Sequence, residues 1–147
     1  EKTGWAYAIN NNADADIVGA INDENGYRAY NFTSDTELGT LGGTNSVASS
    51  VNDFGIIVGY AQDKDNNFQA CLFDQLQGAL NLNLLVDAPG WNLQYAYDIN
   101  NNGWIVGSGI FEGTERAFLL KPIPEPATVA VLMIGLGLIP LKRSVKR

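Results

Sequence analysis

Three related segments of the sequence determine the fold, and the clearest of them is Ala96-Tyr97-Asp98-Ile99-Asn100-Asn101-Asn102-Gly103-Trp104-Ile105-Val106-Gly107. Residues 48–59 follow the same pattern without a gap, A-x-x-[IV]-N-[ND]-x-G-x-I-V-G, and residues 6–19 form a looser copy with two extra turn residues and no turn glycine. Asparagine at the first turn position and glycine at the fourth suit a type I turn followed by a residue at positive φ. The flanking Ile-Val pairs favour strand, so each copy predicts a β-hairpin.

Each copy continues beyond its hairpin into a second apolar run, which starts at Arg28, Gln69 and Arg116. Polar clusters at 23–26, 63–67 and 112–113 precede these runs and predict a second turn. We therefore expect three meanders of at least three strands, at about residues 5–32, 46–74 and 95–120, within a β-repeat domain of residues 1–121. Residues 38–41 and the alternating 80–84 are candidates for a further strand after the first two copies.

This pattern predicts an all-β protein of antiparallel repeated meanders, arranged like a propeller or as an open β-repeat array, followed by one C-terminal apolar helix. No stretch before residue 127 has a convincing helical apolar period. Closed propellers usually contain four to eight blades, more than the three copies found here. Three alternatives follow: a fragment of a longer protein, an open array, or an assembly completed by another chain.

Composition narrows the function classes. The chain of 147 residues has 16 acidic and 9 basic residues and a formal charge of -7, which disfavours a nucleic-acid partner. It has no histidine and a single cysteine, Cys71, so the commonest general base, the commonest zinc ligands and an internal disulfide are all missing. Cys71 lies in an apolar run and is expected to be buried. We predict no catalytic, cofactor-binding or metal residues.

The C-terminal tail has a different character from the body. Residues 127–141 carry no charge; Pro124, Glu125 and Pro126 precede them, and Lys142, Arg143, Lys146 and Arg147 follow. As a helix this uncharged run would span about 22 Å, shorter than the roughly 30 Å core of a bilayer. The terminal basic cluster favours a cytoplasmic position for that end. We expect a linker at 122–126 and an apolar sorting or membrane helix with a basic end at 127–147.

The order of a Pro-Glu-Pro motif, an apolar stretch and a basic cluster resembles the PEP-CTERM sorting signal of Gram-negative bacteria. The resemblance covers residues 123–147 and implies recognition by an exosortase, a membrane-embedded processing enzyme that cleaves near the Pro-Glu-Pro, in organisms that make extracellular polysaccharide. The repeats resemble HAF-type extracellular repeats through residues 38–43, the Ile-Asn-Asn-x-Gly-x-Ile-Val-Gly core and the triplet at 116–118. Arg28, Gln69 and Arg116 stand where that family has histidine.

These features predict an exported, surface-sorted structural or interaction protein that is not an enzyme. It would be found in the cell envelope or outside the cell, transiently anchored in the inner membrane by its C-terminal helix. The expected partners are the membrane and an exosortase-like enzyme, with extracellular polysaccharide as a further candidate. The alternative is a carbohydrate-binding module, in which aromatic side chains stack on sugar rings: Trp5, Trp91, Trp104, Tyr95 and Tyr97.

Two further hypotheses concern the acidic residues. Asp63, Asp65 and Asn67 have the spacing of calcium-loop ligands, but Phe68 stands where such a loop needs glycine, so a solvated turn is favoured. Carboxylates for a glycosidase or lyase are available, yet none lies in a context that singles it out.

Overall fold

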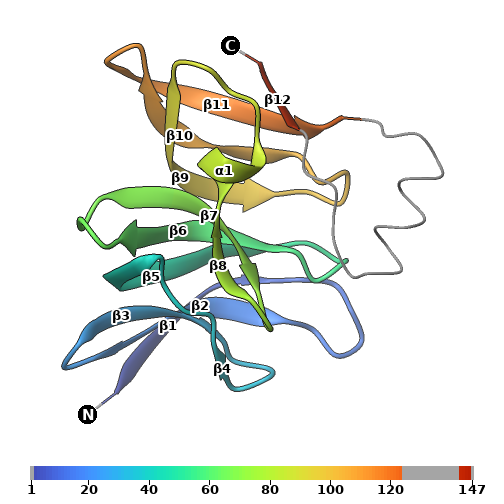
Figure 1. Ribbon diagram of the computed structural model, residues 1–147. Helices are drawn as coiled ribbons and strands as arrows, with labels where there is room; N and C mark the ends of the chain where they lie inside the picture. Colours follow the sequence, from blue (N-terminus) through green and yellow to red (C-terminus); the bar gives the residue numbers. More distant parts are fainter. Residues whose placement is uncertain (1, 124–142, 147) are drawn as a thin grey trace.

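The computed structural model describes residues 2–123 and 143–146 and consists of three four-stranded antiparallel sheets (Figure 1). The first sheet contains β1 (Thr3–Ile9), β2 (Ile17–Asp23), β3 (Gly26–Asn31) and β4 (Thr36–Glu37). The second contains β5 (Gly42–Val51), β6 (Ile57–Asp63), β7 (Phe68–Asp74) and β8 (Gly78–Asn81). The third contains β9 (Trp91–Ile99), β10 (Ile105–Phe111), β11 (Thr114–Pro122) and β12 (Arg143–Lys146). The predicted all-β, antiparallel class is therefore confirmed.

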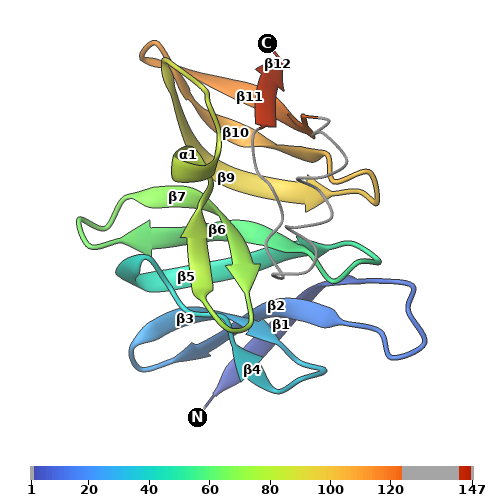
Figure 2. The same cartoon turned by 45° about the vertical axis from the view of Figure 1, so that its right-hand side comes forward.

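The sheets follow one another along the chain and are stacked in that order, with the second sheet in the middle (Figures 1 and 2). Each predicted meander supplies the first three strands of one sheet. The first strand of each later sheet lies across the preceding sheet, so β5 contacts β1, β2 and β3, and β9 contacts β5, β6 and β7. The repeat in the sequence is therefore also a repeat in space.

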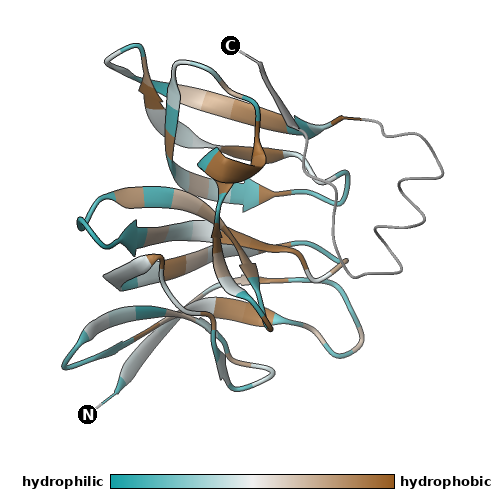
Figure 3. Ribbon diagram, in the orientation of Figure 1, coloured by the Kyte–Doolittle hydropathy of each residue, from teal (hydrophilic) through white to brown (hydrophobic). Residues whose placement is uncertain are grey.

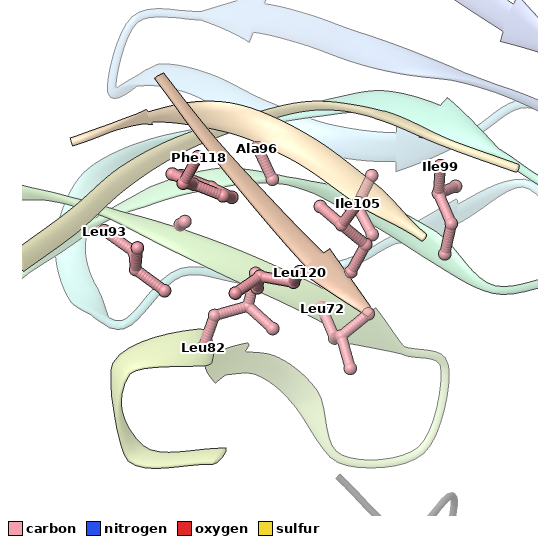
Figure 4. Packing of buried hydrophobic residues seen from close by; sticks show 10 residues of the cluster. Leu72, Leu82, Leu93, Ala96, Ile99, Ile105, Phe118 and Leu120 are labelled. Atoms are coloured by element: carbon pink, nitrogen blue, oxygen red, sulfur yellow. The ribbon is translucent and has the colours of Figure 1, made fainter. Parts of the chain in front are cut away.

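Two apolar cores fill the spaces between neighbouring sheets. Between the first and second sheets, residues such as Val18 and Ala29 pack with Val51 and Ile57. The other core joins Leu72 of the second sheet to Leu82 and to residues of the third sheet such as Ile105, as Figure 4 shows from close by. Hydrophilic residues concentrate at the turns (Figure 3). Because no sheet has a core of its own, each depends on its neighbour for burial of apolar surface.

A short helix, α1 (Leu82–Leu85), replaces part of the strand predicted at 80–84. The Asn81 side chain caps it by accepting a hydrogen bond from the Asn83 backbone N–H. Leu82 is fully buried in the core, whereas Leu84 is 84% exposed. The alternating leucines therefore do not lie together on one face of a strand. The fourth strands, β4 and β8, begin earlier than the predicted residues 38–41 and 80–84.

A β-bulge recurs at the same point of every first strand. It falls at Tyr7, Ser49 and Tyr97, each opposite the Val-Gly pair of the next strand. A Cβ on the glycine of that pair would overlap the carbonyl oxygen of the first strand: Gly19 with Trp5, Gly59 with Val47, and Gly107 with Tyr95. Close backbone approach thus explains why the motif ends in glycine.

The expected C-terminal helix falls mostly on residues outside the described part of the chain, and so do Pro124, Glu125, Pro126, Lys142 and Arg147. Arg143 and Lys146, which we expected at the basic end of that helix, instead belong to β12, paired antiparallel with β11. Among the described residues, none of the helical segments has the length and apolar character required to cross a bilayer.

Candidate functional site

The repeated turns form the most regular polar arrangement of the described residues. In the hairpin turn of the second copy, at residues 52–55, the Asn52 Oδ1 accepts hydrogen bonds from the backbone N–H groups of Phe54 and Ile56, both at 3.0 Å. Asn100 does the same for Asn102 and Trp104, also at 3.0 Å. The glycine after each turn has positive φ, +73° at Gly55 and +71° at Gly103, which confirms the predicted turn chemistry.

The amide nitrogens of these asparagines join one turn to the next. Asn10 Nδ2 donates to the Asn52 carbonyl oxygen, and Asn52 Nδ2 donates to that of Asn100, each at 3.1 Å. Asn10 and Asn52 are both buried. We call Asn10, Asn52 and Asn100 the asparagine ladder. Positive-φ tolerance does not explain these asparagines, since none of the three has positive φ. Each amide oxygen accepts within its own turn, and the amide nitrogens of Asn10 and Asn52 also donate to the next turn.

Asp53 reinforces the ladder from the surface. Its carboxylate accepts from the Asn11 backbone N–H at 2.8 Å and from Asn101 Nδ2 at 2.7 Å, so it contacts the turns on both sides. The hydrogen bond from the Asn11 backbone, followed by that from the Asn101 side chain, lowers the pKa of the Asp53 carboxyl below its ordinary value. Ser50 adds a further link between the second and third sheets through its hydroxyl, 2.5 Å from Asp98 Oδ1.

Aromatic side chains from all three sheets gather in a second arrangement, which we call the aromatic stripe: Trp5, Tyr7, Tyr27, Tyr60, Phe68, Tyr95 and Tyr97. Tyr60 lies at its centre, with ring centroids 5.6 Å from Phe68 and 5.1 Å from Tyr95. Tyr95 in turn stacks on Tyr97 at 6.2 Å, with the two rings almost parallel. Burial, with a smaller contribution from neighbouring tyrosines, raises the pKa of Tyr60.

One end of the stripe surrounds a hollow of about 340 Å³ between the first two sheets, lined by Trp5, Tyr7, Ala20, Tyr27, Val47 and Tyr60. Trp5, Tyr7 and Tyr27 are all exposed. Trp5 and Tyr27 meet edge to face, with centroids 6.4 Å apart. Exposed aromatic faces around a hollow can stack on a flat apolar surface such as the face of a sugar ring.

The predicted platform of three tryptophans and two tyrosines is brought together only in part. Trp5, Tyr95 and Tyr97 belong to the stripe. Trp91 instead packs against Phe111 and Phe118, with centroids 5.1 Å and 6.2 Å away. Trp104 lies beneath Lys121, whose Nζ is 3.7 Å from the ring centroid.

The stripe also contains Tyr7, Tyr27, Tyr60 and Phe68, which the sequence analysis did not single out. A signal for them was present in the repeat. Tyr7 and Tyr97 occupy the same bulge position, and Tyr27 and Phe68 occupy corresponding positions at the start of the third strand. Alignment of the three copies position by position would have grouped these aromatic residues on one surface.

A larger hollow, about 580 Å³, lies on the third sheet and is lined by Trp91, Phe111, Glu115, Arg116 and Ala117. Arg116 is one of the three residues that replace the histidine of HAF-type repeats. Its counterpart Arg28 forms an ion pair with Glu37, with Nε 3.2 Å from Oε1. Arg28 therefore contributes to the link between β3 and β4 on the first sheet.

The Asp63 turn is organised by its own hydrogen bonds. Asp63 Oδ1 accepts from the backbone N–H groups of Asp65 at 2.9 Å and Asn67 at 3.0 Å, and Oδ2 accepts from the Gln69 side chain. The Asn67 backbone bond is the main cause of a lowered pKa at Asp63. Within residues 2–123 and 143–146 there is no cluster of three or more acidic or cysteine side chains suited to a metal ion.

Cys71 is completely buried in the core between the first and second sheets. This confirms its prediction as a buried small side chain. Burial raises the pKa of its thiol to about 12, so the thiolate is scarcely populated at neutral pH.

Comparison with known proteins adds no relative: no protein-family model, no curated protein and no solved structure matches the chain.

Proposed function

We propose that this protein is an exported, surface-sorted structural or interaction protein with no catalytic activity. The observation that carries the proposal is the order of the tail: Pro124, Glu125 and Pro126, then the uncharged residues 127–141, then a basic end. All 16 acidic residues lie before residue 127. This asymmetry favours a tail whose basic end stays in the cytoplasm while the acidic body crosses the membrane.

In this proposal an exosortase-like enzyme recognises the tail and cleaves near Pro124 to Pro126, as the resemblance to PEP-CTERM signals implies. The body is then released or retained at the envelope. The scaffold role is supported by the use of the recurring polar side chains, since Asn10, Asn52 and Asp53 join neighbouring turns. Cleavage would also remove β12 and leave β11 as the edge strand of its sheet.

The intact mass of the protein recovered from its native envelope tests the proposal. We expect a mass that lacks everything after the Pro-Glu-Pro region. Replacing Pro124, Glu125 and Pro126 by alanine should preserve the full-length C-terminus, whereas Pro122→Ala, just outside the motif, should still be processed. A wild-type protein that keeps residues 127–147 would contradict cleavage, and a protein found only in the cytoplasm would contradict export.

We also propose that the three sheets are consecutive units of a propeller-like or open β-repeat array. The support comes from their uniform relationship, in which the first strand of one sheet lies across the preceding sheet and the asparagine ladder links the turns. Three units are fewer than the four to eight blades of closed propellers.

A second candidate function is carbohydrate binding on the aromatic stripe. The observation in its favour is the exposure of Trp5, Tyr7 and Tyr27 around the 340 Å³ hollow. Aromatic faces bind sugars by stacking on their apolar sides, with the hydroxyl groups left at the rim. We expect the ligand to be an extracellular polysaccharide, because the aromatic surface suits sugar rings and the proposed location of the protein is outside the cell.

Binding of the full chain to a glycan array tests this second function. Trp5→Ala should weaken binding at least tenfold, because it removes the indole, the largest aromatic ring that lines the hollow. Trp104→Ala is the matched control, since Trp104 lies away from the stripe under Lys121. Wild-type binding that is unaffected by Trp5→Ala, or no binding by the wild type, would exclude the stripe as the sugar site.

A further inference from the structure

The chain forms the same kind of interface twice, between the first and second sheets and between the second and third. The outer faces of the first and third sheets each present one side of that interface without a partner sheet among the described residues. Val18 and Val58 occupy the same repeat position, and each is 0% exposed because the next sheet covers it. The third member of this set, Val106, is 45% exposed. The outer face of the third sheet therefore presents the side of the interface that would meet a following sheet.

The opposite end of the stack shows the complementary side. Val51 and Ile99 are equivalent positions that pack onto the preceding sheet, and they are 6% and 5% exposed. Their equivalent in the first sheet, Ile9, is 63% exposed. The first sheet thus presents the apolar residue that would cover the valine of a preceding sheet.

The asparagine ladder ends in the same way. Asn100 accepts its two turn hydrogen bonds through Oδ1, but its Nδ2 has no acceptor among the described residues. The equivalent nitrogens of Asn10 and Asn52 each donate to the asparagine carbonyl of the next turn. The acceptor that would continue the series is the Asn10 carbonyl of another copy.

We propose that a second copy of this chain docks head to tail, with its first sheet on the outer face of the third sheet. A second copy is favoured over another partner because its Ile9 would pack on the third sheet as Val51 and Ile99 pack on the sheets before them. Its Asn10 carbonyl would likewise accept from Asn100 as the Asn52 and Asn100 carbonyls accept from Asn10 and Asn52. Such a heterologous contact forms a ring when its rotation closes and a filament when it does not. The inference rests on the interaction role proposed above and names its partner, but is independent of the sorting tail.

The mass of the full chain in solution tests the proposal, measured by light scattering in a mild detergent with the detergent contribution subtracted. We expect a concentration-dependent mass of at least two chains. Ile9→Arg and Val106→Arg should each weaken association at least tenfold, because each removes one side of the interface. Leu76→Arg is the control: Leu76 is exposed but lies in the turn between β7 and β8, so association should be unchanged.

Mixing the two arginine variants provides a signature specific to head-to-tail docking. Each retains one intact face, so an equimolar mixture should form a one-to-one complex that grows no further. Asn100→Asp should weaken wild-type association while keeping its own turn, since only the Nδ2 donor is lost. Circular dichroism checks that each variant is folded.

A wild-type chain that stays monomeric would overturn the proposal, as would a mixture that fails to associate. Association abolished by Ile9→Arg but unaffected by Val106→Arg would show a symmetric contact between first sheets instead. None of these results changes the C-terminal mass that tests sorting, so failure of one proposal is distinguishable from failure of the other.

Discussion

At the scale of single residues, the Val-Gly glycines have a role that side-chain chemistry alone does not suggest. Gly59 faces the bulge in β5, where a Cβ would overlap the Val47 carbonyl oxygen. Its hydrogen-bonded backbone cannot move away without disrupting the pairing of β5 with β6. The recurrence of this glycine in all three copies thus reflects the close approach of two strands at each bulge.

Gly59→Ala should therefore destabilise the protein by about 2–4 kcal/mol, the range expected when a residue is forced against buried backbone. Gly113→Ala is a suitable control, because Gly113 has a φ of +82° but no atom within 4 Å of an added Cβ. It should cost only about 1 kcal/mol, from the unfavourable left-handed backbone conformation of a residue with a Cβ. Urea unfolding measures the stability of both variants. Equal losses of stability would show that backbone conformation, and not the close approach of two strands, explains the glycine at position 59.

Asp53 makes stability depend on pH. Hydrogen bonds from Asn11 and Asn101 lower its folded-state pKa below 3.8, the value of the unfolded chain. The native state then binds the proton less tightly than the unfolded state, so the stabilisation is present above pH 3.8 and is lost as pH falls through the lowered folded pKa. An NMR titration of the Asp53 carboxyl should show the lowered pKa, and Asp53→Asn should remove this part of the acid destabilisation.

At the scale of elements, the hairpins and second turns could be predicted because Asn, Gly and β-branched residues act locally. The four-residue helix could not, since residues 80–84 have a strand-like alternation. Tertiary packing determines the conformation of residues 82–85, because the Asn81 cap and the burial of Leu82 against the third sheet favour one helical turn. The aromatic stripe was also missed in part, because its members come from all three sheets.

Leu82 and Leu84 provide a matched test of this explanation. Leu82→Ala should cost about 2–5 kcal/mol, because it leaves a cavity between the second and third sheets. Leu84→Ala should change stability by less than about 0.5 kcal/mol, because that side chain is exposed. Urea denaturation of the two variants compares them directly; similar losses would contradict the helical turn, in which Leu82 enters the core and Leu84 does not.

At the scale of the whole molecule, the asparagine ladder ties the three sheets together. Asn52 is the central member, since its turn receives a bond from Asn10 and gives one to Asn100. The two apolar cores lie on either side of the second sheet. Polar and apolar contacts therefore run between the same pairs of sheets.

Asn52→Asp should destabilise the monomer by about 1–3 kcal/mol at neutral pH, because it removes a buried donor and leaves the Asn100 carbonyl without that bond. Asn25→Asp, at an exposed position in the turn between β2 and β3, should have little effect. Thermal unfolding followed by circular dichroism measures the difference. An unchanged midpoint for Asn52→Asp would show that the ladder does not contribute to stability.

The bulge glycine, the turn asparagine and the valine before the glycine recur in register with one another, so each unit carries a complete set of contact residues on both sides. Gene duplication or loss of one whole unit would accordingly preserve every junction that remains, since the newly adjacent units would meet through the same positions. Insertions shorter than a unit would be confined to the turns, where the first copy already accommodates two extra residues. Evolution can thus lengthen or shorten such an array in whole modules without redesigning its interior.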